Sequence, residues 1–150
     1  MTERQRINSF LSQKNIAVVG FSRDPKKFGS TVFTTLQQKG YNVFAVNPAG
    51  GSTPDGQTIF SRVTDLPEEV NAAVILTKPD KTNIEVANTI GKGISHIWVQ
   101  QVSQNNETIL MLENSGVVYV AKRCILMHAN PSGFHGFHRS LAKFFGLLPK

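Results

Sequence analysis

The sequence of 150 residues contains one cysteine, Cys124, and so cannot form an internal disulfide. Disulfides are rare where the cell keeps thiols reduced, and the lone cysteine therefore favours a cytoplasmic protein. No apolar run approaches the roughly 20 residues that a membrane span requires. The N-terminus, MTERQRINSFLSQKN, is polar and lacks the apolar core of a signal peptide. These absences predict a protein with no membrane partner.

Charged residues are few, and more of them are positive than negative. Charged residues make up 17% of the chain, and the formal net charge is +6 at pH 7. Such a balance favours anionic ligands. However, the basic residues do not form a run of five or six, and few aromatic residues lie between them, as a nucleic-acid-binding face would require. We therefore expect a small phosphorylated ligand rather than nucleic acid.

Short apolar runs alternate with amphipathic stretches along the chain. Strands are expected at 15–20, 41–48, 58–60, 71–79, 95–101 and 117–124, and helices at 29–40, 80–93, 105–116 and 137–145. Asp80 is the expected N-cap of the second helix, and Gly40 the residue that ends the first.

Strands that alternate with helices in this way predict an α/β protein. We expect a Rossmann-like three-layer α/β/α fold with a mainly parallel sheet of five to six strands. A single domain should span residues 1–150, with a helical or irregular lead-in at 1–14 and a tail that includes a helix at 125–150. In such sheets the ligand lies beyond the carboxyl ends of the strands, where the strand order reverses.

The first loop lacks the glycine pattern of an NAD site, G-x-G-x-x-G. Gly20 begins the turn, Ser22 replaces the second glycine, and the next glycine is Gly29. The acidic residue expected about 20 residues further on, which would accept a hydrogen bond from the ribose, is also missing. The second strand ends instead on Asn47 and Pro48.

The longer loop carries three cations, Arg23, Lys26 and Lys27, just before a helix expected to start near Ser30. Helix N-termini attract phosphate through free N–H groups and the helix dipole. Three added cations suit more phosphate charge than a pyrophosphate alone, and Asn47 would not repel a phosphorylated ribose. The combination favours NADP or coenzyme A over NAD.

These segments resemble the small stand-alone CoA-binding domain proteins, which are similar to the N-terminal domain of the succinyl-CoA ligase alpha subunit. The matching segments are IAVVGFSRDPKKFG, GYNVFAVNP, AAVILTKP, IWVQ and GVVYVAKRC, in that order. The resemblance implies a Rossmann-like fold that holds coenzyme A or an acyl-CoA across the strand ends.

The resemblance also implies where the ligand would lie. The expected site residues are Gly20, Phe21, Ser22, Arg23, Lys26, Lys27, Gly29 and Ser30 around the phosphates, Asn47 and Pro48 beside the adenosine, Thr77, Lys78 and Pro79 on the opposite wall, and Gln100 on the neighbouring strand. Relatives tend to carry a glycine shortly after Gln100, where this chain has Val102. We expect the backbone there to be less free to approach a ligand.

Cysteine and histidine near the end of the chain could suggest a metal or thiol site. His128, His135 and His138 follow Cys124, but there is no second cysteine, and loop-forming residues separate the histidines. We expect no metal, a surface or ligand-proximal role for the histidines, and a buried structural role for Cys124. Trp98 is likewise expected in the core.

The tail predicts an amphipathic helix with an apolar stripe. Phe137, Leu141, Phe144 and Phe145 have helical spacing. We expect the stripe to cover the protein's own core, with contact to a second copy as the alternative. A monomer or a homodimer is therefore compatible with the sequence.

The sequence shows no convincing set of nucleophile, base and acid, and we expect ligand binding without catalysis. Two alternatives stay open: a small NADP-dependent oxidoreductase and a nucleotide-sensing regulatory or interaction module. The Tyr-x-x-x-Lys pair of short-chain reductases is missing, because Tyr41 is followed four positions later by Ala45 and Tyr119 by Arg123.

Overall fold

The computed structural model describes residues 1–129, which form one parallel six-stranded sheet. The strands lie in the order β3-β2-β1-β4-β5-β6. Their bounds are Asn15–Val19 (β1), Asn42–Val46 (β2), Ile59–Phe60 (β3), Ala72–Ile75 (β4), His96–Gln100 (β5) and Val118–Arg123 (β6). β1 pairs with both β2 and β4, so the strand order reverses between β1 and β4.

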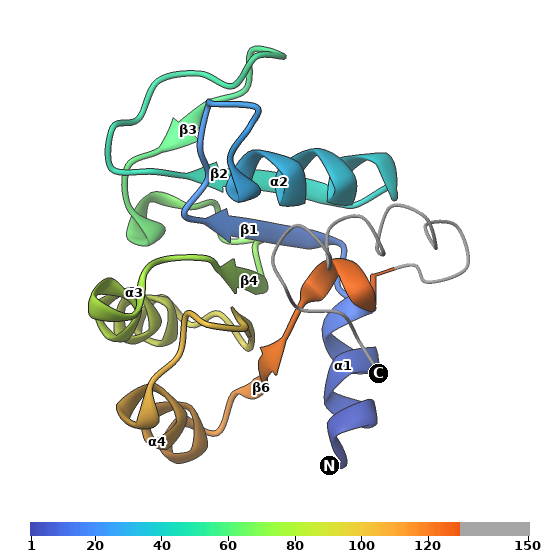
Figure 1. The fold of residues 1–150 in the computed structure, drawn as a ribbon, viewed down its shortest axis with the longest axis vertical. Helices are drawn as coiled ribbons and strands as arrows, with labels where there is room; N and C mark the ends of the chain where they lie inside the picture. Colours follow the sequence, from blue (N-terminus) through green and yellow to red (C-terminus); the bar gives the residue numbers. More distant parts are fainter. Residues whose placement is uncertain (130–150) are drawn as a thin grey trace.

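Helices cover both faces of the sheet, as Figure 1 shows. Helices α1 (Glu3–Leu11) and α2 (Phe28–Gln38) pack on one face with the 3-10 helix η2 (Ile125–Met127). Helices α3 (Pro79–Lys92) and α4 (Asn106–Ser115) pack on the other with η1 (Val63–Asp65). The predicted Rossmann-like three-layer fold is confirmed.

The central strands are apolar at successive positions because both of their faces are buried. In β1, Ile16 and Val18 face the α1–α2 layer, while Ala17 and Val19 face the α3–α4 layer. Every residue of β4 is buried as well. Burial on two sides explains why these segments appear in the sequence as unbroken apolar runs.

Trp98 and Cys124 belong to the core, as predicted. The Trp98 side chain is fully buried, and its ring meets that of Phe10 edge-on at 5.4 Å between centroids. Its indole N–H donates to the carbonyl of Arg123 at 2.9 Å. Cys124 is 8% exposed and packs in the same cluster.

Two predicted helix starts were wrong by one or two residues. The N-cap of α3 is Lys78, and Pro79 occupies the first helical position, so Asp80 lies in the first turn and is not the cap. Proline suits this place because its φ is already helical and its missing N–H would have no partner within the helix. Helix α2 begins at Phe28, ahead of Ser30.

Two further findings concern the limits of the described chain. Among residues 1–129, none of the helices has the length and apolar character needed to cross a membrane. The predicted tail helix at 137–145, with its stripe of Phe137, Leu141, Phe144 and Phe145, lies outside the described residues, as do His135 and His138.

Polar side chains connect helix α1 to strands β5 and β6. The Ser9 hydroxyl lies 2.9 Å from Nε2 of His96, and the Ser95 hydroxyl lies 2.8 Å from Nδ1 of the same ring. The Arg123 guanidinium bonds the Glu3 carboxylate at 3.0 Å. These contacts tie the first helix to β5 and β6.

Histidine protonation should weaken the fold. Burial lowers the pKa of His96 from its ordinary 6.5. Burial, with a further contribution from Arg123, also lowers the pKa of His128. The unfolded chain then binds protons at a higher pH than the folded chain, so stability should fall as the pH drops below 6.5. We expect urea titrations of the variant carrying both His96→Gln and His128→Gln to lose less stability than wild type between about pH 7 and about pH 5.5. An unchanged loss would contradict this expectation.

Val102 adopts a strained backbone conformation. Its φ is 68°, in the left-handed region, although its side chain is β-branched and 70% exposed. The backbone therefore takes the conformation that a glycine would favour, despite the valine.

Replacing Val102 with glycine should stabilise the protein by about 0.5–1 kcal/mol, because relief of the strain outweighs the added freedom of the unfolded chain. The free energy of unfolding in urea measures this effect. Val102→Ala is the control, because alanine keeps the Cβ atom that causes the strain. Equal stability of the two variants would show that the strain does not exceed the entropic cost of the glycine.

Candidate ligand-binding site

Two glycines let the start of α2 lie directly on the end of β1. Gly20 has a φ of 101°, and its N–H donates to the carbonyl of Val46 at 3.1 Å. A Cβ atom on Gly29 would lie 2.4 Å from the Gly20 carbonyl oxygen. In the G-x-G-x-x-G turn the third glycine permits this close approach of helix and strand. Gly29 has the same role here at a different spacing.

The loop between β1 and α2 is folded by its own side chains. The Ser22 hydroxyl accepts from the N–H of Asp24 at 3.1 Å, and the Asp24 carboxylate accepts from the N–H of Lys26 at 2.9 Å. Asp24 was not among the predicted site residues. It fixes the shape of the loop and adds a negative charge among the three cations.

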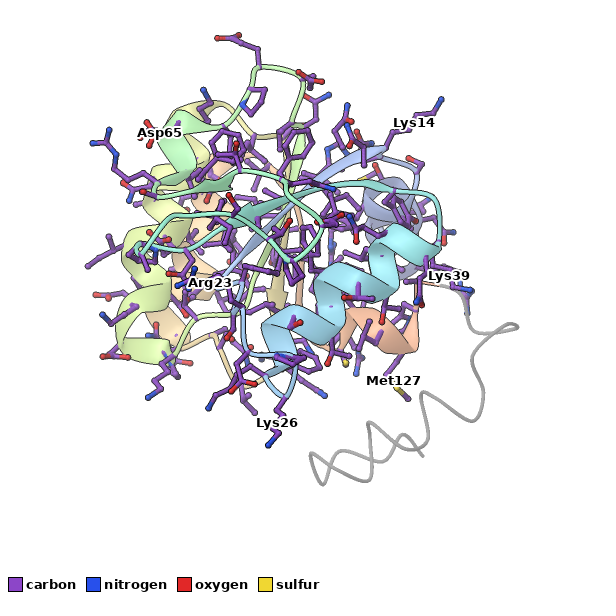
Figure 2. All side chains as sticks on the ribbon, turned by 90° about the horizontal axis from the view of Figure 1, so that it is seen from above. Lys14, Arg23, Lys26, Lys39, Asp65 and Met127 are labelled. Atoms are coloured by element: carbon purple, nitrogen blue, oxygen red, sulfur yellow. The ribbon has the colours of Figure 1, made fainter. Side chains whose placement is uncertain are left out.

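Two of the three loop cations, Arg23 and Lys26, point in different directions. Lys26 extends outward, away from the body of the molecule (Figure 2). Arg23 turns the other way: its Nη1 lies 3.3 Å from where a Cβ atom on Gly51 would be, in the loop after β2. Within residues 1–129, neither these two residues nor Lys27 forms an ion pair. All three are exposed.

Asn47 uses both ends of its side-chain amide within the protein. Its Nδ2 donates to the Phe21 carbonyl at 2.6 Å, and its Oδ1 accepts from the Ala49 N–H at 2.8 Å. Asn47 thus pins the first loop to the end of β2. A carboxylate, which cannot donate, could not make the first of these bonds.

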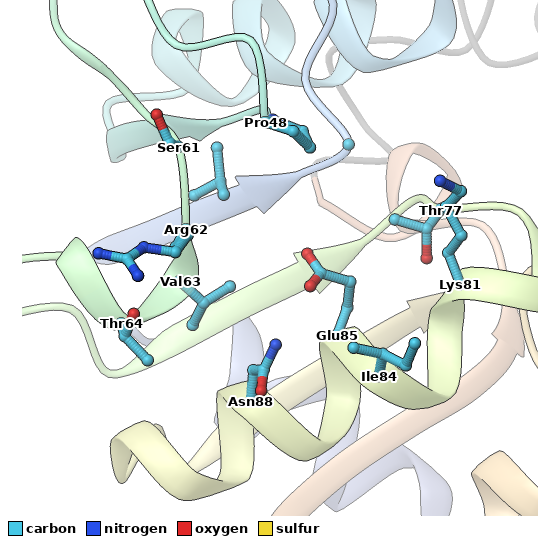
Figure 3. A pocket seen from close by; sticks show the side chains of 12 residues that line it. Pro48, Ser61, Arg62, Val63, Thr64, Thr77, Lys81, Ile84, Glu85 and Asn88 are labelled. Atoms are coloured by element: carbon cyan, nitrogen blue, oxygen red, sulfur yellow. The ribbon is translucent and has the colours of Figure 1, made fainter.

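A cleft of about 730 Å³ opens at the carboxyl ends of β1, β2 and β4, beside the reversal of strand order (Figure 3). Its lining residues come from these strand ends, from the segment after β3 and from one face of α3. They are Gly20, Val46, Pro48, Ser61, Arg62, Val63, Thr64, Thr77, Lys81, Ile84, Glu85 and Asn88.

The cleft contains three of the predicted site residues, Gly20, Pro48 and Thr77. The others do not line it: Phe21, Ser22, Arg23, Lys26, Lys27, Gly29, Ser30, Asn47, Lys78, Pro79 and Gln100. Phe21 and Ser30 line a separate, smaller hollow beside α2. Among the predicted residues, Gln100 lies furthest from the expectation. It is 5% exposed, and its Oε1 accepts from the N–H of Ile125 at 3.1 Å, so it holds the start of η2 on the α1–α2 side of the sheet.

Sequence reasoning missed two walls of the cleft. One is the segment 61–64, which follows β3 and includes the start of η1. The other is the face of α3 that carries Lys81, Ile84, Glu85 and Asn88. Their spacing of three and four residues places them together on the helix. Nothing in the sequence distinguished this half-polar face from an ordinary solvated one.

The helices beside the cleft begin without capping side chains. Both α1 and α4 start with a capping box, made by Thr2 with Gln5 and by Asn105 with Thr108. Neither α2 nor α3 has a side chain that caps its N-terminus, and α2 has no acidic residue in its first turn. An anion at the start of α2 would therefore meet no competing carboxylate in that turn.

A metal site does not form among the described residues. Within residues 1–129, no three side chains of His, Cys, Asp or Glu come close enough to hold an ion. The ring of His128 lies against Trp98, with 5.8 Å between centroids.

A comparison with known families identifies the domain. Residues 14–130 match the family model described as CoA binding domain. The chain belongs to the CoA binding domain family. The family resemblance expected from the sequence is thereby confirmed.

Relatives with assigned activities are far larger than this chain. It is 35% identical over 71 residues to the alpha subunit of acetate–CoA ligase (ADP-forming) II of Pyrococcus furiosus, a match that covers 47% of the chain and 15% of the relative. It is 26% identical over 124 residues to acetate–CoA ligase (ADP-forming) I of Archaeoglobus fulgidus, covering 76% and 18%. The chain therefore spans less than a fifth of these relatives.

Solved structures of similar size share the fold. A hypothetical protein of Pyrococcus horikoshii has a TM-score of 0.78 and 29% identity, with 85% of this chain and 89% of that chain covered. A conserved hypothetical protein of Pyrococcus furiosus has a TM-score of 0.72 and 30% identity, covering 76% and 97%. A Thermus thermophilus protein has a TM-score of 0.76 and 26% identity, covering 85% and 96%.

The contact between Gly29 and the first loop can be tested with a pair of alanine substitutions. Gly29→Ala should destabilise the protein by about 2 kcal/mol or more, because the new methyl group would overlap the Gly20 carbonyl. Gly91→Ala is the matched control, since Gly91 lies within α3 with open space around its Cβ position. That change should stabilise by up to about 1 kcal/mol through helix propensity. Urea unfolding measures both, and a Gly29→Ala variant as stable as wild type would refute the packing role of Gly29.

Proposed function

We propose that the protein binds coenzyme A, or an acyl-CoA, at the carboxyl edge of β1, β2 and β4, without a chemical step of its own. The observation that carries the proposal is the position of the cleft. It opens at Gly20, next to an α2 N-terminus without a capping side chain, and the chain belongs to the CoA binding domain family.

The loop and the cleft suggest how the ligand divides between them. The pyrophosphate would lie at Gly20 and the start of α2, where the backbone and the helix dipole favour negative charge. The adenosine would extend past Pro48 into the cleft. Thr77 and Lys78 would form the opposite wall, from which the pantetheine arm would lead away. The end of β2 carries Asn47 in place of an acid, which leaves room for phosphate on the ribose.

The cations that line the cleft are Arg62 and Lys81. In Figure 3, Lys81 lies on the side of Thr77, whereas Arg62 lies at the other end, beyond Ser61. Arg62 is paired with Asp65 at 3.3 Å, and its side chain is 75% exposed, so a phosphate could compete for it at modest cost. We assign Lys81 to the pyrophosphate and Arg62 to the ribose 3′-phosphate, with Lys26 and Lys27 adding charge from outside the cleft.

Calorimetric titration with coenzyme A, dephospho-coenzyme A, NADP and NAD tests the proposal. We expect coenzyme A to bind at least tenfold more tightly than its dephospho form, which corresponds to about 1.4 kcal/mol. Arg62→Ala should remove most of this difference in affinity between the two ligands, because it removes a cation from the proposed 3′-phosphate position. Lys81→Ala should weaken both ligands to a similar degree.

Two variants serve as references in this titration. Lys14→Ala removes a lysine just before β1, at the opposite edge of the sheet, and should leave the affinities for both ligands unchanged. Lys27→Ala removes a loop cation that does not line the cleft. It should reduce the difference in affinity between coenzyme A and its dephospho form less than Arg62→Ala does. Absence of coenzyme A binding would overturn the proposal, and tighter binding of NADP would favour the oxidoreductase alternative. A change in sedimentation on adding coenzyme A would favour the sensing module.

A further inference from the structure

The cleft contains a carboxylate that the protein itself does not use. Glu85 projects from α3 into the cleft (Figure 3). Within residues 1–129, its carboxylate accepts no hydrogen bond and forms no ion pair, although Lys81 lies one turn away on the same helix face. The two ion pairs of the described chain are Arg62–Asp65 and Arg123–Glu3. Glu85 therefore keeps its full capacity to accept hydrogen bonds from a ligand.

The surroundings of Glu85 suit a flat ring with a polar edge. Val46, Pro48, Val63 and Ile84 supply apolar wall on three sides, from β2, the segment after β3, and α3. Asn88 lies one turn further along α3 and offers both a donor and an acceptor. A nucleotide base presents the same combination, namely apolar faces and an edge of alternating hydrogen-bonding groups.

A carboxylate distinguishes base edges by whether they donate or accept hydrogen bonds. It only accepts hydrogen bonds, so it attracts an exocyclic amino group and repels a carbonyl oxygen at the same position. Adenine carries an amino group at C6, whereas guanine and hypoxanthine carry an oxygen there. A free carboxylate placed against C6 of a purine therefore favours adenine, whereas one placed against N1 and C2 would favour guanine.

Building on the proposed binding of coenzyme A, we propose that Glu85 determines the base specificity of the cleft by accepting a hydrogen bond from the adenine amino group. Asn88 pairs with the neighbouring ring nitrogen. The acid that is missing from the end of β2 is thus matched by one on α3, which faces the base rather than the ribose. The cleft then holds the adenine half of the ligand, and the pantetheine arm lies outside it.

The test compares coenzyme A with 1,N6-ethenocoenzyme A by calorimetry. The etheno bridge removes both amino hydrogens and blocks the adjacent ring nitrogen, while the phosphates and the pantetheine arm are unchanged. We expect wild type to bind coenzyme A at least tenfold more tightly than the etheno form. Glu85→Met keeps the length of the side chain but removes the acceptor, and should lower that ratio by weakening coenzyme A alone. The part of the ratio that remains reflects the contact of Asn88 with the ring nitrogen.

Glu68→Met makes the same change at an exposed glutamate outside the cleft and should leave the ratio at the wild-type value. If wild type binds both forms equally, the inference is wrong. If Glu85→Met keeps the tenfold ratio, the inference is also wrong, because the bridge then acts through shape alone. Glu85→Gln, which keeps a weaker acceptor, should give an intermediate ratio and provides a second readout. Failure of wild type to bind coenzyme A at all would instead overturn the proposed function, so the two failures are distinguishable.

Discussion

The close approach of α2 to the end of β1 is the constraint on which the rest of the site depends. The start of the helix touches the Gly20 carbonyl where Gly29 has no side chain, and there is no room for a single carbon atom at that point. This contact sets the path of the loop between them, which Ser22 and Asp24 then stabilise from within. Asn47 fixes the same loop to β2 through the Phe21 carbonyl. The rim of the cleft is therefore rigid on the side where phosphate would bind.

The sheet could be predicted from the sequence because its strands are buried on both faces. The run AAVI in β4 is typical of a central strand, and the glycines that follow the helices mark where the helices end. Helix starts were harder to place. At α3 the sequence offers Asp80, a good capping residue, and Pro79, a good first residue, and only one of them can begin the helix. The proline prevails, because it is already in the helical φ range.

The residues that line the cleft could be predicted only where the backbone geometry of a strand end determines their position. Gly20, Pro48 and Thr77 were expected and line the cleft, since each follows directly from a strand end. Asn47 and Gln100 have the same kind of position, but their amides bond to the protein, and no sequence pattern reveals which partner a buried amide will find. The α3 face with Glu85 was missed because its polar spacing is the same as that of a solvated helix face. Tertiary structure alone shows that the segment 61–64 lies opposite it.

The attachment of α1 to β5 and β6 has a consequence for the order in which the protein is assembled. Arg123 and Glu3, which bond to each other, are 120 positions apart, and the buried ring of Phe10 lies against that of Trp98. During synthesis the first helix emerges long before its partners, whereas β1, α2 and β2 follow one another and can pair at once. The half of the sheet that contains β1 and β2 can therefore form early. Helix α1 is expected to pack onto the sheet last, after β6 has left the ribosome.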